Sequence, residues 1–237
     1  MDKKIIYLVV GEDNNDKEKT LKSLELITRK GDMVLSTFYK KGEQALEAKL
    51  INEAIAGITK KVDEYYICLI PVGGEILGGK EGLDKIIFPY LTEAGSVYMP
   101  LVEQYELVDG KPSFRGFLNA TLFNSYQTDE RGCLNHSTAI KQIDCSLYFS
   151  FIPLSLLKQR GFSEEITYFY QYEWLNYLTN LIETNTTEEE LTIGIFGVCK
   201  LVGSFSETEQ YKVEDLEVKR ELFKKAQTPY LNETKAA

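Results

Sequence analysis

The sequence lacks several features that identify membrane proteins and histidine-based sites. No apolar run approaches the roughly 20 residues that a transmembrane helix needs. Histidine occurs once, as His136, so a histidine metal cage or a Ser-His-Asp triad would depend entirely on that residue. The N-terminal residues, MDKKIIYLVV, also lack a signal-peptide pattern. We therefore expect a cytoplasmic protein without a membrane-spanning segment.

Cysteine pairs and excess basic charge are absent as well. The four cysteines have no CxxC spacing, and three of them fall in apolar, strand-like segments where a thiol packs as a small hydrophobic group; they are Cys68, Cys133, Cys145 and Cys199. The net charge is −9, whereas proteins that bind nucleic acid need a basic surface to neutralise phosphates. General nucleic-acid binding is therefore not expected, and the sequence leaves the oligomeric state open.

The sequence does contain an alternation of apolar strands and amphipathic helices. Strand-like runs at 3–10, 32–39 and 65–72 are separated by helical patterns at 16–30 and 43–61. Uninterrupted apolar strands of this kind are typical of parallel sheets that helices cover on both faces. The order predicts an α/β fold with a central, mainly parallel sheet flanked by helices, and ligands bind such sheets at the carboxyl edge of the strands.

The second half of the sequence has a looser pattern. It predicts helices near 81–93, from about Pro153, over 164–183 and over 207–226, and strands within 99–108, over 145–152 and over 191–202. A hairpin turn is expected at Asp109-Gly110, so this half should contain a smaller antiparallel part. Because no linker or internal repeat is visible, residues 1–237 are expected to form one domain.

Three segments resemble family 2 glycosyltransferases. The stretch from Lys41 to Glu75 is similar to the family segment in which a glycine, an Asn-bearing helix and an apolar strand lead to an acidic cluster. The sequence RGFSEEITYFYQYEWLNYL (160–178) resembles the family's Gly-Phe-Asp-Glu turn and the helix that bears its catalytic acid, and CKLVGSFSE (199–207) resembles its Ser-x-Ser tail. The resemblance implies a GT-A-like, Rossmann-related fold and the transfer of a sugar from a nucleotide-sugar donor to an acceptor hydroxyl.

The family's metal-binding Asp-x-Asp motif is missing. Its place is taken by Pro71, Val72 and Gly73, and Glu75 is the nearest acid. Three alternatives remain open. Glu75 or an acid of the EDNND loop holds Mg²⁺ or Mn²⁺, or the glycine amides and a lysine stabilise the diphosphate without metal, or the site no longer catalyses. The last alternative describes a GT-A-like binding or scaffolding protein.

The resemblance also indicates site residues. Glu173 is the candidate general base for the acceptor hydroxyl, although a shift of the alignment places the family's acid opposite Tyr170-Gln171 and leaves no base. The residues expected to contact the nucleotide sugar are Val10, Gly11, Glu12, Asp13, Thr37, Gly73, Gly74 and Glu75.

Overall fold

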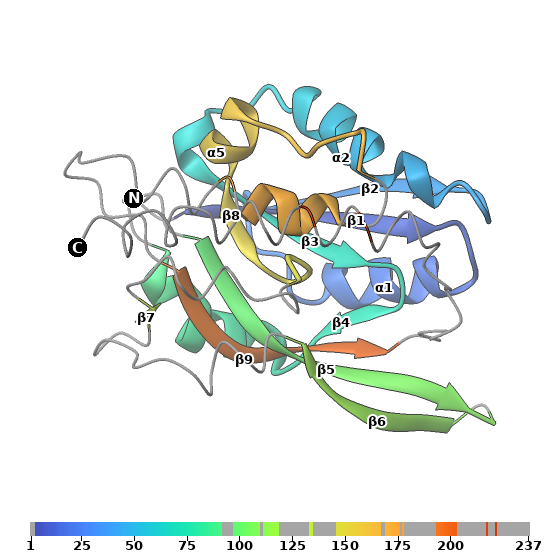
Figure 1. Ribbon diagram of the computed structural model, residues 1–237. Coiled ribbons are helices and arrows are strands. Elements are labelled where there is room, and N and C mark those ends of the chain that lie inside the picture. The colour runs from blue at the N-terminus through green and yellow to red at the C-terminus, as the bar shows by residue number, and fades with distance from the viewer. Residues whose placement is uncertain are drawn as a thin grey trace, which may run out of the picture.

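A mixed sheet runs through the molecule (Figure 1). The computed structural model describes residues 3–91, 97–109, 111–118, 133–134, 146–166, 169–175, 177, 193–202, 217 and 221. The strands are β1 (Lys4–Glu12), β2 (Met33–Tyr39), β3 (Tyr65–Pro71), β4 (Gly74–Ile76), β5 (Val97–Val108), β6 (Lys111–Leu118), β7 (Cys133–Leu134), β8 (Phe151–Pro153) and β9 (Ile193–Val202). Their order is β2-β1-β3-β8-β5-β9-β4, with β6 paired to β5 and β7 paired to β9.

The three N-terminal strands form a parallel unit. β1 pairs in parallel with β2 on one side and with β3 on the other, so the three carboxyl ends meet at one edge. β5 and β9 are also parallel, whereas β8, β4 and β6 pair with their neighbours in the antiparallel sense. The predicted α/β fold, with a mainly parallel central sheet and a smaller antiparallel part, is confirmed.

Helices cover both faces of this sheet, which explains why β1 is apolar along its whole length. Ile5, Tyr7 and Val9 point to the face covered by α1 (Asp16–Glu25) and pack in a cluster that includes Leu24. The alternate side chains, such as Ile6 and Leu8, point to the face covered by α2 (Glu47–Ala56) and α5 (Leu154–Gln159). Within the described residues, no helix is long and apolar enough to cross a membrane.

The helix predicted near 81–93 is replaced by shorter pieces. A turn of α-helix, α3 (Gly79–Gly82), is followed by η3 (Leu83–Ile87), which is π-helical, and by the 3-10 turn η4 (Phe88–Tyr90). Pro89, near the start of η4, has no N–H to continue a helix. Gly79 and Gly82 also destabilise a helix, because glycine is unfavourable in helix interiors. The other 3-10 turns are η1 (Gln44–Leu46) and η2 (Val62–Glu64).

Two further predictions differ in their boundaries. The strand expected over 145–152 is regular only in β8, because Phe149 has a positive φ of 63° that an extended strand cannot accommodate. The helix expected over 164–183 has its first described helical residue at Tyr170, and Glu164 and Glu165 lie in a turn. The β5–β6 hairpin is confirmed. Cys145, Gly110 and nearly all of the predicted helix over 207–226 lie outside the described residues.

Candidate site at the carboxyl edge of the sheet

The chain changes direction across the sheet at β1. After β1 it passes through α1 to β2 on one side, and later returns to β3 on the other side. In open α/β sheets, ligands bind in the crevice outside the carboxyl ends of the strands at such a reversal point. The candidate site therefore lies at the ends of β1, β2 and β3.

The end of β1 packs directly against the residue that follows β3. The N–H of Val72 donates to the carbonyl oxygen of Val10 at 2.9 Å. Gly11 has a φ of +149°, and a Cβ atom at this position would lie 3.0 Å from the Cβ of Val72. Close packing and backbone conformation therefore both favour glycine at position 11.

The Gly73-Gly74 turn is fixed from two sides. The N–H of Gly73, whose φ is +86°, donates to the Oγ1 of Thr20 in α1 at 2.8 Å. A Cβ atom on Gly74 would lie 2.7 Å from the Cζ of Phe149 and 2.8 Å from the carbonyl oxygen of Pro71. The Gly73 amide is thus already hydrogen-bonded, and an anion could use it only by displacing Thr20.

The acidic loop after β1 organises the start of α1. The N–H of Asp13 donates to the carbonyl oxygen of Tyr39 at 2.8 Å, which joins the ends of β1 and β2, and the Asp13 carboxylate forms an ion pair with Lys17. Asn14 accepts a hydrogen bond from the N–H of Asp16 at 2.9 Å. Glu12 ends β1, and Thr37 lies beside Val10 in the register of β1 and β2.

The residues present do not fit a Mg²⁺ or Mn²⁺ site built on paired carboxylates. Pro71, Val72 and Gly73 supply no carboxylate side chain, and Glu75 is an exposed residue opposite Lys200 in the β4–β9 pairing. Asp13 is engaged by Lys17. Among the described residues, no group of three or more His, Cys, Asp or Glu side chains could hold a metal ion. We therefore assign no step at this edge to a metal.

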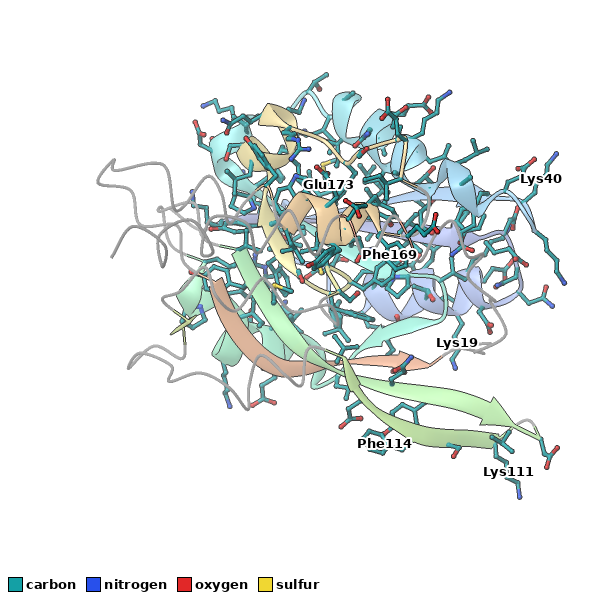
Figure 2. All side chains as sticks on the ribbon, in the orientation of Figure 1. Lys19, Lys40, Lys111, Phe114, Phe169 and Glu173 are labelled. Carbon is teal, nitrogen blue, oxygen red and sulfur yellow. The ribbon has the colours of Figure 1, made fainter. Side chains whose placement is uncertain are left out.

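Glu173 lies in the helical layer that covers the α2 face of the sheet (Figure 2). Its Oε1 atom accepts a hydrogen bond from the guanidinium of Arg160, on the segment that follows α5. Its Oε2 atom is buried and has no hydrogen-bond partner among the residues that the structure describes, while the side chain as a whole is 17% exposed. The indole N–H of Trp174 donates to the Arg160 carbonyl oxygen at 2.9 Å, which fixes this segment against the helix.

A buried carboxylate, Glu47, is a feature that the sequence analysis missed. Glu47 begins α2, is 3% exposed and accepts hydrogen bonds from the hydroxyl groups of Tyr148, at 2.5 Å, and Tyr170. Burial first, and then the Glu47 charge, raise the pKa of both tyrosines well above the usual value, so both hydroxyls stay protonated donors. The only sequence signal is the four-residue spacing of Glu47 from Ile51, which places it on the buried helix face.

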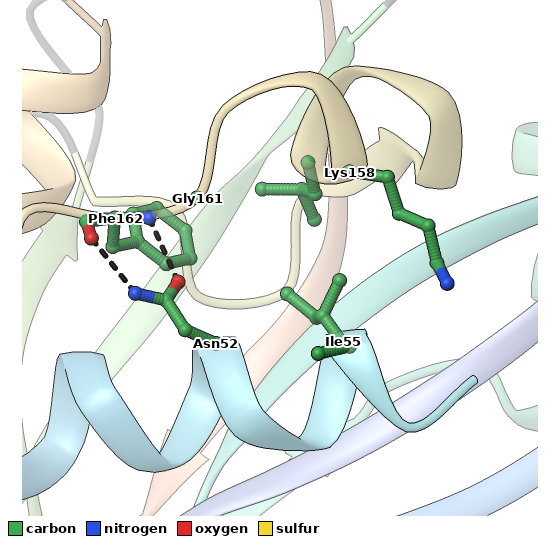
Figure 3. Close-up of a pocket in the computed structure, with 7 residues that line it drawn as sticks. Asn52, Ile55, Lys158, Gly161 and Phe162 are labelled. Atoms are coloured by element: carbon green, nitrogen blue, oxygen red, sulfur yellow. Dashed lines mark hydrogen bonds between the residues drawn. The ribbon is translucent and has the colours of Figure 1, made fainter.

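Asn52 links α2 to the Gly-Phe turn that the resemblance had singled out. Its side chain donates to the Phe162 carbonyl oxygen at 2.8 Å and accepts from the Phe162 N–H at 2.9 Å (Figure 3). A Cβ on Gly161 would lie 2.5 Å from the Asn52 Oδ1, so the contact requires glycine there. These residues line an open pocket of about 360 Å³ between α2 and α5, together with Ile55, Ala56, Leu157 and Lys158.

Comparison with known proteins gives a structural relationship without a sequence relationship. No protein-family model matches the chain. No curated protein matches it in sequence either. Among solved structures it is similar to residues 1–349 of TarS from S. aureus, in complex with UDP, with a TM-score of 0.54 and 12% sequence identity. The match covers 93% of this chain and 64% of that one.

The chain has a glycosyltransferase-like fold. At 12% identity the similarity establishes the fold alone, and the chain spans about 64% of the length of the TarS structure. The assignment of individual residues to a donor site is taken up below as a proposal.

Proposed function

We propose that this protein binds a nucleotide-sugar donor at the carboxyl edge of β1, β2 and β3. The observation that supports this most is the fold shared, over 93% of the chain, with TarS, whose structure contains UDP. The reversal of strand order at β1 supports the same edge on independent topological grounds. The single domain over residues 1–237 and the cytoplasmic location remain predictions from the sequence.

The proposed contacts fall into two groups, one for the nucleoside and one for the diphosphate. The nucleoside would lie across the ends of β1 and β2, against Val10, Gly11, Glu12, Asp13 and Thr37. The diphosphate would lie at the β3–β4 turn, against Gly73, Gly74 and Glu75. Lys17, in the first turn of α1, supplies positive charge at this edge, because breaking its ion pair with exposed Asp13 costs little in water. This favours a metal-independent mode of binding.

Titration with UDP and GDP, each with and without Mn²⁺, tests the donor site by calorimetry. We expect one nucleotide to bind without metal, and Lys17→Ala to weaken binding about tenfold because a charged hydrogen bond to phosphate is lost. Lys19→Ala is the matched control, since Lys19 is an exposed lysine of the same helix. The proposed site would be contradicted if neither UDP nor GDP binds, or if Lys17→Ala and Lys19→Ala weaken binding equally.

Sugar transfer to an acceptor hydroxyl is a second candidate function, and one observation favours it. The Oε2 atom of Glu173 is buried and has no hydrogen-bond partner among the described residues, so its lone pairs could accept the proton of an acceptor hydroxyl that displaces the surrounding side chains. Two observations favour the alternative, a donor-binding protein without turnover: Oε1 is ion-paired with Arg160, and the described part of the chain has no cluster of metal-binding side chains. An assay of sugar release from the bound donor distinguishes the two.

A further inference from the structure

The buried carboxylate of Glu47 is connected to the Gly73-Gly74 turn by one short segment, residues 146–150. The Tyr148 hydroxyl donates to Glu47 on the α2 face of the sheet. The next side chain, Phe149, is fully buried in the cluster on the opposite face, where α1 packs. Adjacent residues thus contact the two faces, and the segment lies beside the carboxyl half of β3, where Tyr148 bridges to Leu69.

Backbone hydrogen bonds hold the 146–150 segment against β3. The N–H of Phe149 donates to the Leu69 carbonyl oxygen at 2.6 Å, and Tyr148 forms a parallel bridge with Leu69. The N–H of Leu147 donates to the Gln171 side chain at 2.8 Å. Because the positive φ of Phe149 is unfavourable for a non-glycine residue, these contacts must hold its backbone in place.

The Phe149 ring forms the support beneath the Gly73-Gly74 turn. A Cβ atom on Gly74 would lie 2.7 Å from the Cζ atom of this ring, so the ring and the turn backbone are in direct contact. A displacement of the Tyr148–Phe149 peptide would therefore displace the turn. Thr20 holds the turn from α1, and Phe149 supports it from the sheet.

We propose that Glu47 and Tyr148 are positioning residues, which set the conformation of the β3–β4 turn through Phe149. Their effect on nucleotide binding rests on the proposed function, in which this turn contacts the diphosphate of the donor. Their effect on the turn itself is independent of any ligand. Glu47 is too deeply buried to contact a donor directly, so its effect must pass through the side chains that it binds.

Two tyrosine variants separate this role from general stability. Tyr148→Phe and Tyr170→Phe each remove one hydroxyl that donates to the same Glu47 carboxylate. Tyr148 is directly adjacent to Phe149, whereas Tyr170 belongs to the helix after the Gly-Phe turn and connects to the 146–150 segment indirectly, through the Gln171 side chain. We expect similar losses of thermal stability, but faster amide hydrogen exchange over residues 72–76 in Tyr148→Phe alone.

Nucleotide affinity provides the second measurement. We expect Tyr148→Phe to raise the Kd for UDP about three- to tenfold, and Tyr170→Phe to change it less than about twofold, as is usual for mutations that act through an intermediate residue. If the wild-type protein binds neither UDP nor GDP, the donor proposal fails, and hydrogen exchange still decides the positioning role. Equal exchange over residues 72–76 in the two variants would overturn that role.

Discussion

Gly74 is the residue at which an added side chain would meet the closest contacts around the β3–β4 turn. Its Cβ position lies 2.8 Å from the Pro71 carbonyl oxygen, which belongs to the backbone, and 2.7 Å from the Phe149 ring. We expect Gly74→Ala to lower the free energy of unfolding by about 2–4 kcal/mol, because the turn cannot move without disturbing β4. Urea denaturation measures this change.

Gly57 provides the control for that substitution. It follows α2 with helical dihedral angles, φ −67° and ψ −14°, and its Cβ would have ordinary contacts of 3.5 Å or more. Alanine at this position should leave stability unchanged or raise it by up to about 1 kcal/mol, since it restricts the unfolded chain. Equal destabilisation by both alanines would contradict the packing described for Gly74.

Asn52 illustrates how one side chain can fix the path of a distant segment. Its amide satisfies both backbone groups of Phe162, 110 residues away in sequence. We expect Asn52→Ala to destabilise the protein by about 1–3 kcal/mol, because it leaves partly buried backbone groups unsatisfied. Glu53→Ala, an exposed change on the same helix, should cost less than about 0.5 kcal/mol by thermal unfolding. If Asn52→Ala lowers stability by no more than Glu53→Ala does, water replaces the hydrogen bonds of the Asn52 amide.

At the scale of elements, a mutation in the helix that begins at Tyr170 distinguishes the two candidate functions, sugar transfer and donor binding without turnover. If the protein transfers sugar with Glu173 as base, Glu173→Gln should lower turnover about 10²-fold or more while UDP affinity stays nearly constant, because an amide cannot take the acceptor's proton. Glu165→Gln, an exposed change in the preceding turn, serves as the control. Turnover retained by Glu173→Gln would exclude Glu173 as the base.

The strands and crossovers of the N-terminal half could be predicted because local patterns determine them. β1 and β3 are buried on both faces, so their uninterrupted apolar sequence indicates their environment directly. The 145–152 prediction was wrong over residues 146–150, because tertiary contacts impose the positive φ of Phe149 on a sequence with strand propensity. Periodicity carries no information about such a contact.

The sequence indicated the carboxyl edge of the parallel strands as the ligand edge, and the individual site residues stay predictions. The close packing at Gly11, against Val72, and at Gly74, against Phe149, was not predicted, because it depends on contacts between segments distant in sequence. Glu47 was missed because its hydrogen-bond donors, Tyr148 and Tyr170, are more than 100 residues away in sequence. The contact of Asn52 with Phe162 has the same long-range origin. The catalytic role of Glu173 stays a prediction.

At the scale of the whole molecule, the described residues contain no group of three or more His, Cys, Asp or Glu side chains that could hold a metal ion, and this has a direct consequence for metal binding. Mg²⁺ and Mn²⁺ are held in such sites by carboxylates together with substrate phosphates. We expect the protein alone to show no Mn²⁺ affinity tighter than about micromolar in calorimetry, and nucleotide affinity to change less than about threefold on adding Mn²⁺. Sub-micromolar Mn²⁺ affinity without nucleotide would point to Glu75 or Asp13 as ligands.

The pairing of β4 with β9 has a consequence for the order in which the chain folds. β1, β2 and β3 are joined by short crossovers and can associate while later residues are still being synthesised. β4 follows β3 directly, yet its partner in the sheet is β9, where Gly74 lies opposite Leu201. Contacts between residues so distant in sequence form late, because a long loop must close first. During synthesis, the parallel core can therefore form before β9 pairs with the β3–β4 turn. If this turn contacts the donor as proposed, a ribosome-bound chain would gain nucleotide affinity only after residue 202 has emerged.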